Sequence, residues 1–441
     1  MMLSLPKYDC YKDSGVDWLG EIPVHWGITR MANFGSFTKG KGISKNDISE
    51  QGLPALLYGD IYTKYNIKTD YLITTVPNNI TSNSAQIYYN DILFTGSGET
   101  LEDIGKCIVY KGNSVGYAGG DVIIFRQNKC NSLYLSYLFN SSFFNEQKAK
   151  LAKGQIIVHI YSSKLKTIKF CLPPLEEQER IVKFLDRKCE QVERAIALKQ
   201  RLIELLDEQR AIIINQAVTK GLNPNAPMKD SGIDWLGDIP SHWEVTRMAN
   251  FGSFNKGKGI SKNDISEKGL PALLYGDIYT KYNIKTDYLI TTVPNNIASN
   301  SAQIYYDDIL FTGSGETLED IGKCIVYKGN DIGYAGGDVI IFRQNRYNSL
   351  YLSYIFNSFL FKEQKAKLAK GQIIVHIYSS KLKNIKFCIP PIEELEKIVE
   401  YLDQKTAEIE ELKEKTLQQI EKLKEFKQIL IAEAVTGKIK V

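Results

Sequence analysis

Pro173-Pro174-Leu175-Glu176-Glu177-Gln178 begins a run that continues to Thr219 and organises the rest of the chain. Two prolines and the acidic residues that follow are typical of a helix N-terminus, and Gly221 lies just past the end of the run. At 1.5 Å per residue, a helix over this run would span about 65–70 Å. Apolar residues recur in steps of four and three, with skipped turns, which is a heptad pattern; they are Leu185, Cys189, Val192, Ile196, Ile203, Leu206 and Ile213.

The chain contains an internal repeat. Residues 12–224 align with residues 229–441 at a constant offset of 217, without insertion or deletion. Over residues 31–170 only thirteen of 140 positions differ, whereas the long helical runs diverge freely. The second run extends from about Pro391 to Thr436, and its apolar positions are Leu402, Ile409, Ile420, Leu423 and Leu430. Lys199 and Lys413 interrupt the two apolar stripes, and each helix must bury its stripe on a partner, most simply the other helix.

Each repeat unit is expected to hold one globular α+β domain and one long helix. Short apolar runs predict strands at 53–58, 71–75, 92–94, 107–110 and 122–125, followed by an amphipathic helix over about Ser132–Ala152. The predicted layout is an N-terminal segment (1–30), a first domain (31–171), a central helix (172–220), a linker with the repeated segment (221–247), a second domain (248–388) and a C-terminal helix (389–441).

Composition indicates a cytoplasmic protein without a membrane span. No apolar run reaches the ~18 residues that a span needs, and the start of the chain lacks a signal-peptide pattern. The seven cysteines include no CxxC pair, so we expect reduced thiols. Charge is unevenly distributed, because residues 31–171 carry 15 Lys and Arg against 10 Asp and Glu, whereas residues 389–434 carry 7 against 12. Basic domains permit a nucleic-acid partner.

Motifs for enzymatic chemistry are missing. No Asn/Asp-Pro-Pro-Tyr or Walker A sequence occurs, and Gly96-Ser97-Gly98 lacks the third glycine of a dinucleotide fingerprint. The histidines have no second metal ligand at useful spacing. We therefore expect no cofactor and no metal in this chain. A nuclease-like D…ExK pattern exists in Asp121 with Glu146-Gln147-Lys148, and is repeated by Asp338, Glu363 and Lys365. A solvated helix face explains the Glu and Lys more simply.

Four loops of each domain instead have the composition of DNA readers. Lysines and exposed amides suit phosphates, while Gln, Ser and His can read base edges. For any single residue a solvated loop remains the alternative. The candidates in the first domain are Lys39, Lys41, Lys45, Tyr62, Lys64, Thr95, Ser97, Gln155, His159 and Lys164, and those in the second are Lys256, Lys258, Lys262, Tyr279, Lys281, Thr312, Ser314, Gln372, His376 and Lys381.

Three strings of the sequence occur in a fixed order: residues 13–26 (DSGVDWLGEIPVHW), residues 172–182 (LPPLEEQERIV) and Ala217-Val218-Thr219-Lys220-Gly221-Leu222, which leads into a second copy of the first string at 230–240. With these strings the sequence resembles, over essentially its whole length, the specificity subunits of type I restriction–modification enzymes. The second helix departs slightly, with Leu395 where a Gln is usual.

This resemblance implies two target-recognition domains held apart by an antiparallel helix pair, each reading one half of a bipartite double-stranded DNA target. It further implies two partner methyltransferase subunits, which carry S-adenosylmethionine and modify adenine, and a restriction/translocase subunit that can join them. The specificity subunit itself would be non-catalytic. Because the two domains are nearly identical, we expect an inverted-repeat target. The alternatives are a stand-alone regulatory or architectural DNA-binding protein and a coiled-coil scaffold that binds no nucleic acid.

Overall fold

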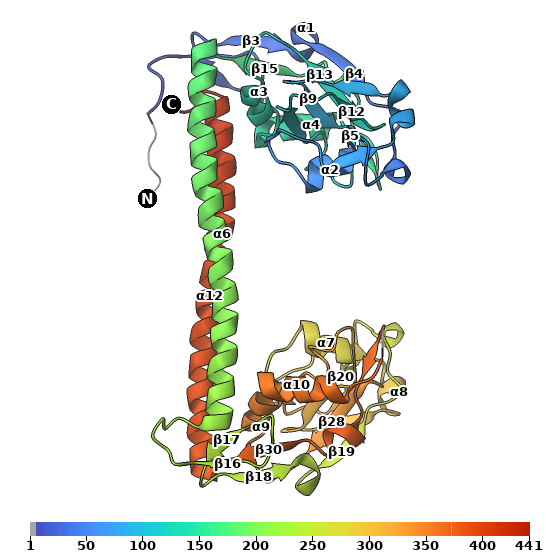
Figure 1. Ribbon diagram of the computed structural model, residues 1–441, viewed down its shortest axis with the longest axis vertical. Helices are drawn as coiled ribbons and strands as arrows, with labels where there is room; N and C mark the ends of the chain where they lie inside the picture. Colours follow the sequence, from blue (N-terminus) through green and yellow to red (C-terminus); the bar gives the residue numbers. More distant parts are fainter. Residues whose placement is uncertain (1–5, 372) are drawn as a thin grey trace. The chain divides into compact units, whose positions relative to one another are not determined.

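The computed structural model describes residues 6–371 and 373–441, which form two compact units. Unit 1 holds the chain up to Lys199 together with Leu417–Val441, and unit 2 holds Gln200–Thr416. Each unit contains one globular domain and a part of each of the two long helices, α6 (Leu175–Lys220) and α12 (Ile392–Val435). Figure 1 shows how the elements of each unit are arranged. The internal repeat predicted from the sequence is thus a repeat of structure.

The first domain is built on two sheets. The five-stranded sheet has the order β4-β13-β9-β11-β6, formed by β4 (Ser36–Lys39), β13 (Val122–Arg126), β9 (Ile92–Thr95), β11 (Cys107–Tyr110) and β6 (Lys68–Thr69). The four-stranded sheet has the order β7-β5-β12-β8, formed by β7 (Thr74–Val76), β5 (Leu53–Leu56), β12 (Gly116–Ala118) and β8 (Ala85–Ile87). Only β6–β11 and β5–β12 pair in parallel within these two sheets.

Alternating side chains of the five-stranded sheet supply two cores. Ile92 and Phe94 belong to the cluster that also contains residues of α3 (Ser132–Phe139), whereas Leu93 packs with residues of the four-stranded sheet and α2 (Tyr58–Thr63). Strand residues alternate between faces, so one apolar strand serves both layers. The domain is therefore a stack of helices, sheet and sheet, an α+β arrangement as the sequence predicts.

The helix expected over Ser132–Ala152 is wrong in one respect, because two helices occupy it. The helix α3 ends at Phe139 and α4 (Ser142–Leu151) begins after Asn140 and Ser141. The Asn140 side chain accepts from the Cys107 amide at 2.9 Å and donates to the Cys107 carbonyl at 2.7 Å. These bonds hold the helix break against Cys107, the first residue of β11. Ser141 then has an extended backbone (φ −67°, ψ 153°) and is the N-cap residue of the new helix.

The second domain repeats these elements at the constant offset. Its sheets follow β19-β28-β24-β26-β21 and β22-β20-β27-β23, and its break lies between α9 (Ser349–Asn357) and α10 (Phe359–Leu368). The sheet strands are β19 (Ser253–Lys256), β20 (Leu270–Leu273), β21 (Lys285–Thr286), β22 (Thr291–Val293), β23 (Ala302–Ile304), β24 (Ile309–Thr312), β26 (Cys324–Tyr327), β27 (Gly333–Ala335) and β28 (Val339–Arg343).

The long helices pack against each other within each unit, in opposite chain directions. In unit 1, Leu185 near the start of α6 shares a core with Leu430 near the end of α12, and in unit 2 Ala217 shares one with Leu402. The predicted antiparallel coiled coil is confirmed. The polar positions that interrupt its seam are paired across it, because Lys199 donates to Gln419 at 2.5 Å and Lys413 to Asp207 at 2.6 Å. Such pairs fix helix register.

Glu177, in the first turn of α6, is buried and bonds three side chains of the N-terminal segment. The Glu177 side chain is 5% exposed and accepts from Trp26 Nε1 at 3.1 Å, from His25 Nε2 at 2.9 Å and from the Tyr8 hydroxyl. Burial, followed by the bond to Glu177, raises the pKa of Tyr8. The motif residues near Trp26 and at Glu177, far apart in sequence, therefore form one junction.

In each domain, the first and last strands pair with each other, and nearby side chains bond to the end of a long helix. Strand β3 (Gly27–Arg30) pairs with β15 (Lys169–Leu172), which leads into α6. The Tyr134 hydroxyl and the Cys171 thiol both donate to the Val435 carbonyl at the end of α12, at 2.9 and 3.3 Å. In unit 2, Tyr351 and Cys388 donate in the same way to Val218 near the end of α6, at 3.3 and 3.4 Å. All seven cysteines are free thiols.

Candidate nucleic-acid interface

The lysine-rich loop of the first domain follows β4 and is held rigidly from inside. The Gly40 amide donates to the Val122 carbonyl at 2.8 Å, and a Cβ at Gly40 would lie 2.1 Å from the Gly119 carbonyl oxygen, so only glycine permits this approach. Beyond it, Asp47 accepts from the amide and the hydroxyl of Ser44, both at 2.7 Å. These bonds lower the pKa of Asp47. The three candidate amines of the loop, Lys39, Lys41 and Lys45, are exposed.

The neighbouring segment Thr95–Gly98 faces inward. Thr95 and Ser97 are 0% and 2% exposed, and the Tyr62 hydroxyl bonds Thr95 Oγ1 at 2.8 Å and donates to the Ser97 carbonyl at 3.2 Å. Burial raises the pKa of Tyr62 to about 12. The hydroxyls of Thr95 and Ser97 therefore position the loops, and direct contact with DNA is not open to them in this conformation.

A short hairpin formed by residues 153–159 completes this edge of the domain. Its second arm contains strand β14 (Val158–His159), which also pairs with β10 (Ser97–Gly98). His159 Nδ1 bonds Ser97 Oγ at 2.8 Å. Lys153 and His159 exchange backbone bonds of 2.9 and 2.7 Å across the hairpin, and the Ile160 amide donates to the Gly96 carbonyl at 2.9 Å. Gln155 lies exposed at the hairpin end.

Backbone contacts join these loops into one edge. Gly96 donates to the Asp121 carbonyl at 2.6 Å, and Asp121 also pairs through its side chain with Lys39 at 3.6 Å. We call residues 39–46, 95–98, 119–121 and 153–161 the recognition edge. Four of the sequence-predicted candidates, namely Lys39, Lys41, Lys45 and Gln155, present exposed side chains on it, and half-buried His159 connects its hairpin to Ser97.

The remaining candidates of the first domain lie beside the recognition edge. Lys64 is engaged with its own domain, because its amine pairs with Asp60 at 2.8 Å and donates to Thr74 at 3.0 Å. Lys164 is exposed on the short helix α5 (Ser162–Leu165), which follows the hairpin. Lys164 is thus free to meet a phosphate, whereas Lys64 would first exchange its present partners.

The second domain places its candidates in the same environments. Thr312 and Ser314 are buried, and the Tyr279 hydroxyl bonds Thr312 at 2.7 Å. His376 bonds Ser314 at 2.8 Å. Gln372 lies outside the described residues. The exposed candidates are Lys256, Lys258, Lys262, Lys281 and Lys381, of which Lys281 pairs with Asp277 at 2.8 Å.

Sequence reasoning missed the apolar side chains of the hairpin. Ile156 is 89% exposed and Ile157 is 53% exposed, while the adjacent Tyr161 is 53% exposed and stacked near His159 with ring centroids 6.4 Å apart. One signal was available in the sequence, because residues 147–175 contain six lysines and no carboxylate. An apolar pair within a purely basic stretch is unusual for a solvated loop.

The structure argues against the nuclease-like alternative. Lys148 is fully buried and donates to the Gly105 carbonyl at 2.6 Å, whereas Glu146 on the same helix is exposed. The two side chains thus leave the helix in different directions, and Asp121 is paired with Lys39. Within residues 6–371 and 373–441, no group of three or more His, Cys, Asp or Glu side chains could hold a metal ion. The expectation of a solvated Lys148 was wrong, because its amine is buried and bonds the carbonyl of Gly105.

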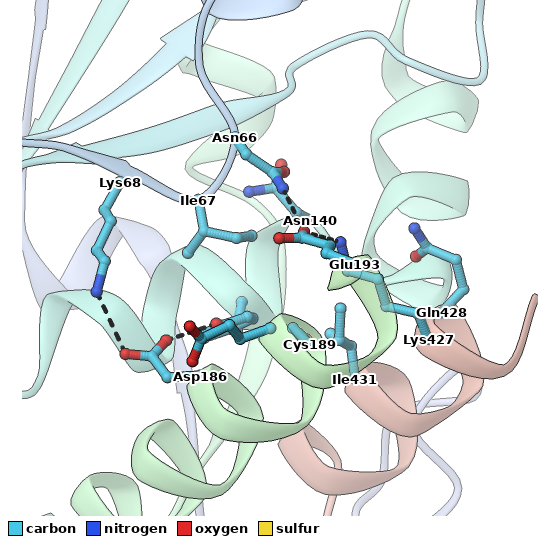
Figure 2. A pocket seen from close by; sticks show the side chains of 12 residues that line it. Asn66, Ile67, Lys68, Asn140, Asp186, Cys189, Glu193, Lys427, Gln428 and Ile431 are labelled. Atoms are coloured by element: carbon cyan, nitrogen blue, oxygen red, sulfur yellow. Dashed lines mark hydrogen bonds and ion pairs between the residues drawn. The ribbon is translucent and has the colours of Figure 1, made fainter. Parts of the chain in front are cut away.

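A pocket of about 420 Å³ lies where the first domain meets the helix pair of unit 1 (Figure 2). Its polar groups pair with one another, since Asp186 accepts from Tyr137 at 2.6 Å and from Lys68 at 3.3 Å. Glu193 accepts from Lys427 at 2.5 Å and from Asn66 at 3.4 Å. With these charges paired, the pocket is a contact region between the first domain and the helices of unit 1.

No helix in the described part of the chain is long and apolar enough to cross a membrane.

Comparisons with known proteins agree with this arrangement. The family model described as "Type I restriction modification DNA specificity domain" matches residues 23–208 and 240–422. The MjaVIII specificity subunit of a type I restriction enzyme from Methanocaldococcus jannaschii is 26% identical over 437 residues, covering 95% of this chain and 94% of that protein. The EcoKI specificity subunit from Escherichia coli K12 is 22% identical, with 95% and 90% covered.

Two solved structures share the fold. A chain described under "complex assembly and conformational transition of the type I R-M system" superimposes with a TM-score of 0.71 at 18% identity, covering 94% of this chain and 98% of that one. The HsdS subunit from Thermoanaerobacter tengcongensis gives a TM-score of 0.54 at 17% identity, with the same coverage. The likeness spans both domains and both long helices.

Proposed function

Because this chain belongs to the type I restriction–modification DNA specificity family and is a specificity subunit, we propose that it reads a bipartite double-stranded DNA target and directs adenine methylation by partner subunits. Each domain reads one half of the target through its recognition edge. The exposed lysines of this edge contact phosphates, while Gln155 and the side chains beside it contact bases.

The observation that supports a symmetric target is the sequence identity between the recognition edge of the first domain and its counterpart in the second, residues 256–263, 312–315, 336–338 and 370–378. All thirteen differences between residues 31–170 and their counterparts lie outside residues 39–46, 95–98, 119–121 and 153–161. Two edges of identical sequence would recognise the same half-sequence. If a pseudo-two-fold axis relates the domains, the half-sequences stand on opposite strands around an unread spacer. The proposed target is therefore an inverted repeat.

Partner subunits supply the chemistry in this proposal. Two methyltransferase subunits that bind S-adenosylmethionine dock on the long helices and on the N-terminal segments, and restriction/translocase subunits join them, all in the cytoplasm. The helices carry more acidic than basic residues, which disfavours DNA there. Exposed Leu202, Leu205 and Ile212 on α6 offer apolar contact area for a protein. This chain contributes recognition, and neither a cofactor nor a catalytic group is assigned to it.

Single-molecule sequencing of methylated adenines tests the proposal, with and without this gene in the same host. We expect one bipartite motif with inverted-repeat halves to lose methylation when the gene is deleted. Two unrelated half-sites would contradict the symmetric target. An unchanged methylome, together with DNA binding by the isolated chain, would instead favour a stand-alone regulatory or architectural protein.

A further inference from the structure

The apolar end of the hairpin, Gln155-Ile156-Ile157, stands out from the rest of the recognition edge. Ile156 at 89% exposure is the most exposed of the large hydrophobic side chains in the described chain, and Ile157 beside it is half exposed. Single exposed apolar side chains are common and need no explanation. Here two adjacent isoleucines and Tyr161, also 53% exposed, gather within six residues.

The hairpin presents these isoleucines on a rigid support. Gly154 has φ +131°, and a Cβ there would lie 1.9 Å from the Ile157 carbonyl oxygen, so the turn is closed tightly. The two backbone bonds between Lys153 and His159 and the Ser97–His159 bond fix its base. A side chain held this way loses little conformational freedom when it binds a partner.

The charge of the chain segment that carries the isoleucines indicates the kind of partner. No Asp or Glu occurs from residue 147 to residue 175, and exposed Lys150, Lys153, Lys164 and Lys166 flank the hairpin in sequence. Exposed Glu99 also lies near the hairpin, because it follows Gly98, which pairs with Val158. An apolar pair carried by a basic segment is still complementary to a groove of duplex DNA, where phosphates line the edges and bases lie at the floor. Isoleucine is among the wedges that proteins insert between base steps, and apolar side chains also contact thymine methyl groups.

We propose that Ile156 and Ile157, and Ile373 and Ile374 in the second domain, are base-contacting residues that enter the DNA groove at their half-site. Ile373 and Ile374 are 88% and 51% exposed. The inference deepens the proposed function and rests on it. The apolar contact adds sequence discrimination at a base step, while the neighbouring lysines hold the backbone.

Binding to a duplex carrying the mapped methylation motif tests this inference, with the full-length chain in complex with its methyltransferase partner. Ile156→Ser should weaken binding about 10-fold, because one exposed isoleucine loses the transfer energy of its burial. The dependence of affinity on salt should stay the same. Lys153→Gln, by contrast, should lower the slope of log affinity against log salt by about 1. Ile73→Ser, which alters a 51% exposed isoleucine of the same domain outside the basic stretch, should leave both unchanged.

The internal repeat supplies a second readout. Methylome sequencing of Ile156→Ser should show relaxed base preference in one half of the target only, because the second domain is intact. A 2-aminopurine placed in the half-site should brighten on binding if the isoleucines open a base step. Thymine-to-uracil replacement should reduce affinity if they contact a methyl group.

Unchanged affinity and an unchanged methylome for Ile156→Ser would overturn the inference, as would a loss of affinity accompanied by a lower salt slope. Failure of the unmodified complex to methylate or bind any bipartite motif would overturn the proposed function instead. Circular dichroism of each variant separates these outcomes from a folding defect.

Discussion

The two globular domains are close copies, but the two long helices that follow them are not. Thirteen of 140 positions differ between the domains, whereas only 18 of the 45 residues in 175–219 are identical to their counterparts. The contacts explain which helix residues are shared. Asp186 and Asp403 both accept from a domain tyrosine, at 2.6 Å each, and Glu193 and Glu410 both pair with a cation of the opposite helix. Some of the shared helix residues therefore lie where the helices meet other parts of the chain.

The positions of the thirteen differences between the domains are also informative. All of them lie outside the recognition edge, some on the outside of the domain, such as Asn145 and Lys362 on α4 and α10, and some inside it, such as Leu138 and Ile355. At one difference a bond survives, because Lys111 donates to Asn90 at 2.5 Å and Lys328 pairs with Asp307 at the equivalent position. At another a bond is lost, because the Thr81 hydroxyl donates to the Asn78 carbonyl and Ala298 replaces Thr81 in the second domain. The proposed reading surface thus lies within the part of the domain that the two copies hold in common.

The largest effect is expected from lengthening the helices while the domains stay as they are. Insertion of seven residues after Lys199 in α6 and seven after Thr416 in α12, where the two compact units meet, keeps both heptad patterns in phase. Each helix gains about 10 Å at 1.5 Å per residue, or about three base pairs of duplex. Methylation at the original motif should be lost and should reappear at the same half-sequences with a spacer about three base pairs longer.

A four-residue insertion in α6 alone is the matched control, because it shifts the heptad phase of one helix against the other. We expect it to reduce methylation at every spacer length. A change in the half-sequences themselves, after either insertion, would show that the helices take part in base reading and that the division between domains and helices is wrong.

The next largest effect is a difference in stability between Glu177, at the start of α6, and Glu394, at the start of α12. The Glu177 side chain is 5% exposed and has three donors, whereas that of Glu394 is 26% exposed and accepts from Trp243 and His242 alone among the described residues. The third donor of Glu177, Tyr8, precedes the repeat, and the residue at its offset is Asn225. Glu177→Ala should reduce the free energy of unfolding by about 3 kcal/mol and Glu394→Ala by about 1 kcal/mol, since the first leaves more buried donors unpaired.

Urea denaturation followed by tryptophan fluorescence measures this difference, together with amide exchange at residues 20–30 and 237–247. Glu176→Ala, which removes an exposed carboxylate from the same helical turn, should cost less than either variant. Equal losses for Glu177→Ala and Glu394→Ala would show that the Tyr8 contact adds nothing.

Much of this architecture is predictable because it rests on local pattern. The heptad stripes locate α6 and α12 to within about two residues of their ends, and the apolar run at 107–110 coincides with strand β11. The copy at a constant offset then gives the second unit. These features depend on periodicity and on the repeat, both of which are visible in the sequence.

What sequence could not give depends on tertiary bonds between distant residues. The helix break at Asn140 is held by Cys107, and the hydroxyl of Ser97 turns inward because His159 and the strand pairing capture it. Lys148 in an amphipathic helix reads as a solvated cation, yet Gly105, with φ +71°, leaves room above it, and a Cβ there would lie 2.9 Å from the Lys148 side chain. None of these partners is close in sequence.

That buried lysine yields the smallest effect, a dependence of stability on pH. Burial lowers the pKa of Lys148, and equally of Lys365, from 10.5 to about 8. Between those values the unfolded chain binds more protons than the folded one, so stability rises with pH. The contribution is complete above pH 10.5 and is lost as pH falls through about 8. Buried Cys107 acts in the opposite sense, because its pKa is raised from 9.0 to about 11 and stability is lost above pH 9.

A double variant, Lys148→Met with Lys365→Met, separates the lysines from the thiols. From pH 8 to pH 9 the free energy of unfolding of the unmodified protein should gain about 1 kcal/mol per lysine over that of the double variant. Urea unfolding at the two pH values measures the gain, and loss of the bond to Gly105 adds only a constant offset. The single variants compare the domains, because Lys362 further lowers the pKa of Lys365 whereas the first domain has Asn145 at that position. Lys362→Asn should therefore bring the second domain toward the first, and identical pH profiles with and without it would show that this surface difference does not reach the buried amine.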